Sequence, residues 1–130
     1  MSCDPTVLGL PIGSDAAYGF VFKDYNDEPI PLAGSEFIFR MAAKYPAIDL
    51  EFMTTADPTI LYVEEGVTIT PVNEPAYVAD WLVLRLIPDI TRQIPRGALT
   101  TWEIERRTED DQRNWGSGVF NGYGGMNPDV

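Results

Sequence analysis

The sequence contains no histidine and only one cysteine, Cys3. Without histidine the chain has neither a Ser-His-Asp nor a Cys-His catalytic arrangement, and it has no imidazole ligand for a metal. A single cysteine forms no internal disulfide and no thiolate zinc site. No base or cation neighbours Cys3 in the sequence, so nothing there activates its thiol. We therefore expect a protein that is not an enzyme, with no catalytic residues, metal site or cofactor.

Basic residues are also few. Nine Lys and Arg against twenty Asp and Glu give a net charge of -11. Binding to nucleic acid or to anionic lipid needs clustered basic side chains, so we expect no direct contact with either. No stretch approaches the roughly 18 apolar residues of a membrane span. Residues 1–5 lack the basic and apolar regions of a signal peptide, which predicts a protein made in the cytoplasm.

Long helices are excluded by the eleven prolines and eleven glycines, which cut the chain into short pieces. Proline alone costs about 3 kcal/mol in a helix interior. The chain nevertheless holds 130 residues, of which 45% are hydrophobic. This is enough for one core and too little for two, so we expect a single domain over residues 1–130.

The pieces between the breaks alternate between apolar and polar residues, which is typical of strands. Residues 81–87 are apolar except for Arg85, as expected for a central strand. We expect a hairpin tip at Glu65-Gly66, a helical turn at 89–92 and a polar turn at 108–114. The strand-like segments are 16–22, 36–41, 48–53, 59–64, 67–72, 81–87, 99–107 and 115–123.

This spacing predicts an all-β fold, a single immunoglobulin-like antiparallel β-sandwich of seven to eight short strands. We expect extended terminal segments at about 1–11 and 122–130. These segments are apolar or glycine-rich and carry little charge. Such segments are suited to lying across a neighbouring subunit at an open sheet edge.

Three stretches of the sequence resemble a known family. They are LPIGSD at 10–15 with the following strand, DYNDEPIPLAG at 24–34 and FIFR at 37–40; TRQIPRG at 91–97 before TWEIE at 101–105; and GVFNGYGGMN at 118–127. Together they resemble the small β-sandwich domains of tailed-phage baseplate and tail proteins, of the upper-baseplate-protein N-terminal type. The resemblance runs from about Pro11 to Asn127. Two positions depart from the family pattern, since Ser14 splits its Gly-Asp step and Ala33 replaces its usual threonine.

The resemblance implies a virion structural protein that is assembled in the host cytoplasm and forms homo-oligomers or contacts with other virion proteins. A tail or baseplate position is the first hypothesis. A capsid decoration or head-fibre protein is an alternative, because both parts of a virion use sandwiches held by surface burial. A carbohydrate-binding module on the virion surface is another, and it requires two or three of Trp81, Trp102 and Trp115 to be exposed together.

Few side chains are candidates for a site. Three acidic clusters lie in expected turns, where carboxylates are solvated; a bound cation is a less favoured reading, and their spacing matches no EF-hand loop. Most aromatic residues alternate along strands and are expected in the core. Trp115 and Tyr123 flank glycines in the last strand, so we predict partner contacts there and at Met126 and Asn127. The clusters are Asp24, Asp27 and Glu28; Glu64 and Glu65; and Glu109, Asp110 and Asp111.

Overall fold

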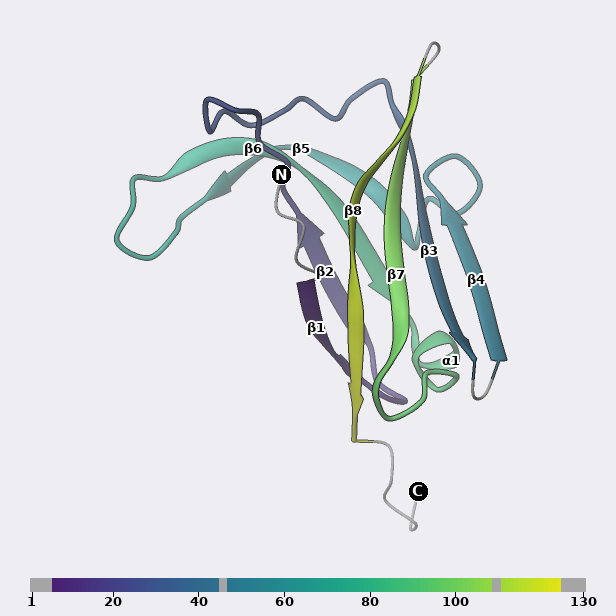
Figure 1. Cartoon of the computed structure of the whole chain (residues 1–130). Helices are drawn as coiled ribbons and strands as arrows, with labels where there is room; N and C mark the ends of the chain where they lie inside the picture. Colours follow the sequence, from purple (N-terminus) through teal and green to yellow (C-terminus); the bar gives the residue numbers. More distant parts are fainter. Residues whose placement is uncertain (1–5, 45–46, 109–110, 125–130) are drawn as a thin grey trace.

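The computed structural model describes residues 6–44, 47–108 and 111–124, which form two packed β-sheets (Figure 1). The five-stranded sheet contains, in spatial order, β1 (Thr6–Pro11), β8 (Asp111–Tyr123), β7 (Gly97–Thr108), β3 (Glu36–Lys44) and β4 (Ala47–Met53). The three-stranded sheet contains β2 (Ala16–Phe20), β6 (Tyr77–Leu86) and β5 (Leu61–Ile69). The short helix α1 (Pro88–Thr91) follows β6, at the expected helical turn.

The predicted fold class, an immunoglobulin-like β-sandwich, is confirmed. In immunoglobulin terms β2, β6 and β5 correspond to strands B, E and D, and β3, β7 and β8 to strands C, F and G. β4 lies beside β3 at the edge of the five-stranded sheet, in the position of strand C′. One pair departs from the antiparallel pattern: β1 runs parallel to β8, with Thr6 opposite Gly118 and Pro11 opposite Tyr123.

Aromatic rings join the two sheets. Phe20 on β2 lies 5.5 Å from Trp102 on β7, measured between ring centroids, and Phe39 on β3 stacks on Trp102 at 5.6 Å. Antibody domains place a disulfide between strands B and F beside a buried tryptophan on strand C. Here the cluster contains no cysteine, so ring packing, worth about 0.5–1.5 kcal/mol per pair beyond area burial, links the sheets.

The expected hairpin tip at Glu65-Gly66 is wrong. β5 continues through both residues to Ile69, and the chain turns back only before Tyr77. Gly66 lies in a bulge, with a φ of +66°, and its N–H donates to Asp80 Oδ1 at 3.2 Å. Glycine adopts a positive φ without steric cost, so here it marks an irregularity within a strand and not a turn between two strands.

Both ends of the described chain belong to the sheet, although the sequence predicted extended terminal segments. β1 lies within the expected segment 1–11, and Leu10 on it is fully buried. β8 extends through Tyr123, inside the expected segment 122–130. The polar turn expected at 108–114 is shorter, because β7 and β8 remain paired as far as Thr108 and Asp111.

Candidate interaction surface

The outer face of the five-stranded sheet is divided into two halves of different chemistry. The upper half is the part toward the C-terminal end of β7 and the N-terminal end of β3. Here Ser117, Glu103, Arg40 and Glu51 lie side by side on neighbouring strands, in one register row. In the row below, Val7, Val119, Thr101, Ala42 and Asp49 lie side by side across the same strands. Charged side chains therefore gather above, and small or apolar side chains below.

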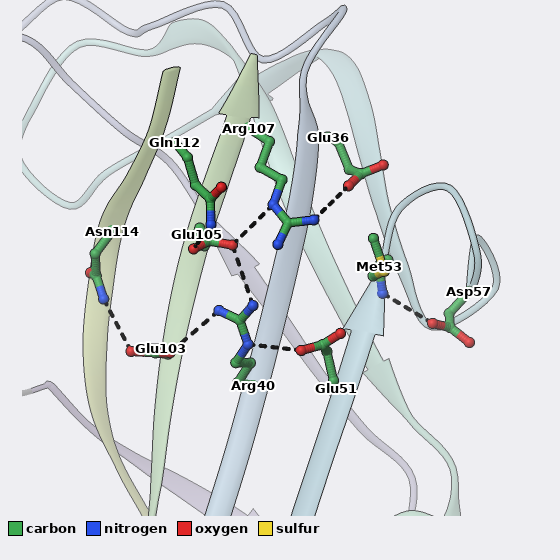
Figure 2. Close-up of polar contacts among 10 residues, drawn as sticks. All are labelled: Glu36, Arg40, Glu51, Met53, Asp57, Glu103, Glu105, Arg107, Gln112 and Asn114. Atoms are coloured by element: carbon green, nitrogen blue, oxygen red, sulfur yellow. Dashed lines mark hydrogen bonds and ion pairs between the residues drawn. The ribbon is translucent and has the colours of Figure 1, made fainter. Parts of the chain in front are cut away.

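Arg40 is the centre of the upper half, which we call the Arg40 network (Figure 2). Its Nε lies 2.8 Å from Glu51 Oε2, and its two terminal nitrogens lie 3.5 Å from Glu103 Oε1 and 3.4 Å from Glu105 Oε2. Strands β4, β3 and β7 all contribute to it, so one guanidinium is shared among carboxylates from both neighbours of β3. This cross-strand arrangement stabilises the register of the sheet.

Glu105 is the most constrained carboxylate of the Arg40 network. It accepts a 2.6 Å hydrogen bond from Gln112 Nε2 and pairs with both Arg40 and Arg107. The Gln112 hydrogen bond, followed by the bond and charge of Arg40, lowers the pKa of Glu105 below its ordinary value. Arg40 is therefore fully engaged within the chain, whereas the side chains of Glu51 and Glu103 remain about half-exposed.

We call the lower half the apolar patch and define it by Val7, Ala42, Leu99, Val119 and Tyr123. Val7, Leu99 and Tyr123 are 62%, 58% and 53% exposed. Ala42 and Thr101 border two depressions of about 590 and 340 Å³. Arg40, Asp49 and Glu103 also line the larger one, and Leu99 also lines the smaller one. The exposed apolar side chains of the patch present a surface that association can bury, with charged residues at its upper border.

The structure separates the predicted partner residues. Tyr123 lies in the apolar patch, where its ring covers Gly9 so closely that a Cβ at Gly9 would come within 3.3 Å of it. Trp115 is half-buried and packs against Phe22 at 5.1 Å between ring centroids, with the Arg106 guanidinium 4.4 Å from its ring centroid. Met126 and Asn127 lie outside the described residues.

Tyr18 anchors β1, and with it Val7, to the three-stranded sheet. Its hydroxyl donates to the Gly9 carbonyl oxygen at 2.7 Å. Burial of the phenol, with a smaller contribution from Tyr123, raises the pKa of Tyr18 to about 12. The neutral phenol is therefore the form that holds β1 in place.

The acidic clusters have structural explanations where they are described. Asp24 Oδ1 accepts hydrogen bonds from the backbone N–H groups of Asn26 and Glu28, which closes a turn. Glu64 and Glu65 are exposed on β5. Glu109, Asp110 and the side chain of Asp111 lie outside the described part. Among the residues that the structure describes, no three His, Cys, Asp or Glu side chains are placed to hold a metal ion.

The three tryptophans do not form one platform. Trp102 is buried in the core, and Trp115 packs at the upper end of the sandwich. Trp81 instead covers Gly19 on β2, where an added Cβ would lie 2.7 Å from its ring. This separation gives the carbohydrate-binding alternative no support from the tryptophans.

Sequence reasoning missed Val7, Leu99 and the Arg40 network. Leu99 is separated from Thr101 and Glu103 by even numbers of residues, so it points to the same polar face of its strand. The sequence therefore could have predicted that this leucine is exposed. The encounter of Arg40 with carboxylates from two other strands had no such signal, because it depends on strand register.

No family model matches the chain, and no match is found among the curated proteins or among the solved structures. No helix in the described residues is long and apolar enough to span a membrane.

Proposed function

We propose that this chain is a structural protein of a phage virion, which assembles in the tail or baseplate through contacts with copies of itself and with other virion proteins. The observation that carries the proposal is the apolar patch, an exposed apolar surface on the same sheet face where Arg40 already pairs with carboxylates of its own chain. The sequence resemblance to baseplate sandwich domains supports the same assignment.

The net negative charge favours association at the apolar patch over association elsewhere. A net charge of -11 keeps free copies apart and reduces sticking to nucleic acid. Asp49 lies at the far edge of the row that contains Val7, and Glu103 lies in the row above it. Burial of the apolar patch therefore supplies attraction at one surface, while repulsion acts over the rest.

The test is a double substitution in the apolar patch, Val7→Asp with Leu99→Asp. Two carboxylates buried in a contact cost well over 1.4 kcal/mol, so we expect self-association to weaken by about tenfold or more. The control is Tyr25→Asp with Val72→Asp, which adds the same charge at two highly exposed positions outside the patch. Sedimentation velocity measures self-association, and quantitative imaging of particles measures incorporation.

We expect the control to associate and enter particles as the native protein does. A native protein that stays monomeric at all concentrations and is absent from purified particles would contradict the proposal. Density in the head and not in the tail would move the protein to the capsid decoration alternative.

A further inference from the structure

Two side chains of opposite charge, Lys44 and Asp49, lie on the outer face of the five-stranded sheet beside the apolar patch. Lys44 ends β3 and Asp49 lies on β4, the edge strand farthest from β1, and both side chains are exposed. With the residues that the structure describes, neither side chain forms a hydrogen bond or an ion pair. Arg40, one row above Asp49, differs in holding three carboxylates of its own chain.

Lys44 and Asp49 belong to neighbouring register rows of the sheet. Asp49 lies opposite Ala42, in the row that crosses the middle of the apolar patch, and we call this the Asp49 row. Lys44 lies opposite Ala47, one row lower, and lines the smaller depression together with Leu99. We call this the Lys44 row. The acid therefore lies one row above the base.

The bulk of the side chains also changes from one row to the next. Ala42, Thr101 and Val119 of the Asp49 row border the larger depression, of about 590 Å³. Leu99 in the Lys44 row and Tyr123, still lower on β8, are 58% and 53% exposed, so they project from the face. The hollow therefore lies above the projecting side chains, on one and the same face.

A second copy turned by a two-fold axis fits this arrangement. The axis runs across the strands, in the plane between the two facing copies, level with the midpoint between the Asp49 row and the Lys44 row. Such an axis reverses the order of the rows, so the Lys44 row of each copy faces the Asp49 row of the other. Leu99 then lies over the hollow of the other copy, and Lys44 lies over its Ala42, with Asp49 on the adjacent strand.

We propose that the apolar patch binds the apolar patch of a second copy of this chain about such an axis, with Lys44 of each copy paired to Asp49 of the other. Neighbouring strands lie about 4.8 Å apart and packed sheets about 10 Å apart, distances that the long lysine side chain spans. A second copy is favoured over another partner because its own rows place a base against each acid. The inference rests on the proposed function, to which it adds the partner and the geometry of the contact.

The experiment uses the full-length protein and reverses one charge at a time. Lys44→Glu places two acids against each other at both ends of the contact, and Asp49→Lys places two bases there. Each variant alone should therefore self-associate about fivefold more weakly or worse, as measured by sedimentation velocity. An equimolar mixture of the two variants should associate as the native protein does, because the introduced glutamate then faces the introduced lysine and the native Asp49 faces the native Lys44.

Arg85→Glu and Glu74→Lys are the matched controls. They change the net charge by the same amounts at exposed positions of β6 and of the connection between β5 and β6, outside the five-stranded sheet. We expect both to associate as the native protein does, alone and mixed. The mixture of Lys44→Glu with Asp49→Lys also separates a contact between copies from an attraction within one chain, since each of its chains carries a single sign of charge at both positions.

Charge-reversal variants that associate as strongly as the native protein, or a mixture that associates no better than its components, would overturn the inference. If Val7→Asp with Leu99→Asp still weakens association in that case, the apolar patch acts in another arrangement and the proposed function stands. Stronger association after removal of residues 1–5 or 125–130 would also overturn the inference, because the chain's own ends would then cover the patch in the intact protein.

Discussion

The Arg40 network and the apolar patch occupy the same outer face of the same sheet, yet they direct their interactions differently. Arg40, Glu51 and Glu105 find their partners on adjacent strands within the chain. Val7 and Leu99 also lie on that face, but they remain largely exposed. The comparison teaches that the upper half supports the fold, whereas the lower half is available for association.

The largest effect on stability is expected from Arg40→Ala. This variant leaves Glu51, Glu103 and Glu105 facing one another without their shared cation, which should lower the free energy of unfolding by about 1–3 kcal/mol. Urea unfolding measures the change. Arg92→Ala is the control, because its pair with Asp89 is exposed and should contribute less than about 0.5 kcal/mol. Equal losses in the two variants would remove the distinction between the halves.

Tyr18→Phe tests whether the apolar patch depends on the anchoring of β1. Loss of the hydrogen bond to the Gly9 carbonyl oxygen should cost about 1 kcal/mol. The pKa of Tyr18 is raised from 10.0 to about 12 in the folded protein, so this contribution is complete below about pH 10 and is lost as the pH rises through 12. Unfolding measured between these pH values should therefore show the native advantage over Tyr18→Phe shrinking. A constant difference would mean that the phenol does not titrate in the folded state as inferred.

Glu105→Gln tests how much the Arg40 network contributes to stability at acid pH. The folded protein holds the pKa of Glu105 below its ordinary value, so its carboxylate stabilises the fold above that value. This contribution is lost as the pH falls through the ordinary and then the lowered pKa. Thermal unfolding across this acid range should be less dependent on pH in Glu105→Gln than in the native protein. Identical pH profiles would contradict the role of Glu105 in the Arg40 network.

The smallest effect on stability is expected from Leu99→Ser in the apolar patch. Leu99 is largely exposed, so the free energy of unfolding should change by less than about 0.5 kcal/mol. Self-association measured by sedimentation should nevertheless weaken. A large loss of stability would show that Leu99 supports the fold, and the two halves would then not differ in the way described.

Much of the fold was predictable because strand alternation is a local pattern. Phe37, Phe39 and Met41 were expected on one face, and all three are fully buried. Gly66 shows the limit of such reasoning, since a glycine with positive φ serves equally in a hairpin turn and in a bulge. The choice was made by pairing with β6, where Asp80 accepts the Gly66 N–H.

The candidate site was less predictable. Tyr123 and Trp115 were singled out together because they flank glycines in one strand. The structure places Tyr123 in the apolar patch and Trp115 against Phe22 and Phe37, on opposite sides of the five-stranded sheet. Successive residues of a strand point to opposite faces, so an extra residue reverses which face the following residues point to. The bulge in the pairing of β8 with β7 adds such a residue at Trp115.

The amino-acid sequence by itself determined that this protein has no internal disulfide, carries a strongly negative charge and folds as an immunoglobulin-like sandwich of short strands. These properties follow from composition and from a period of two residues, both of which are local. Only the tertiary structure decided that Arg40 meets three carboxylates, that Val7 and Leu99 share an exposed surface and that β1 runs parallel to β8. Each of these depends on register between strands far apart in the chain, which is set by the packing of both sheets together.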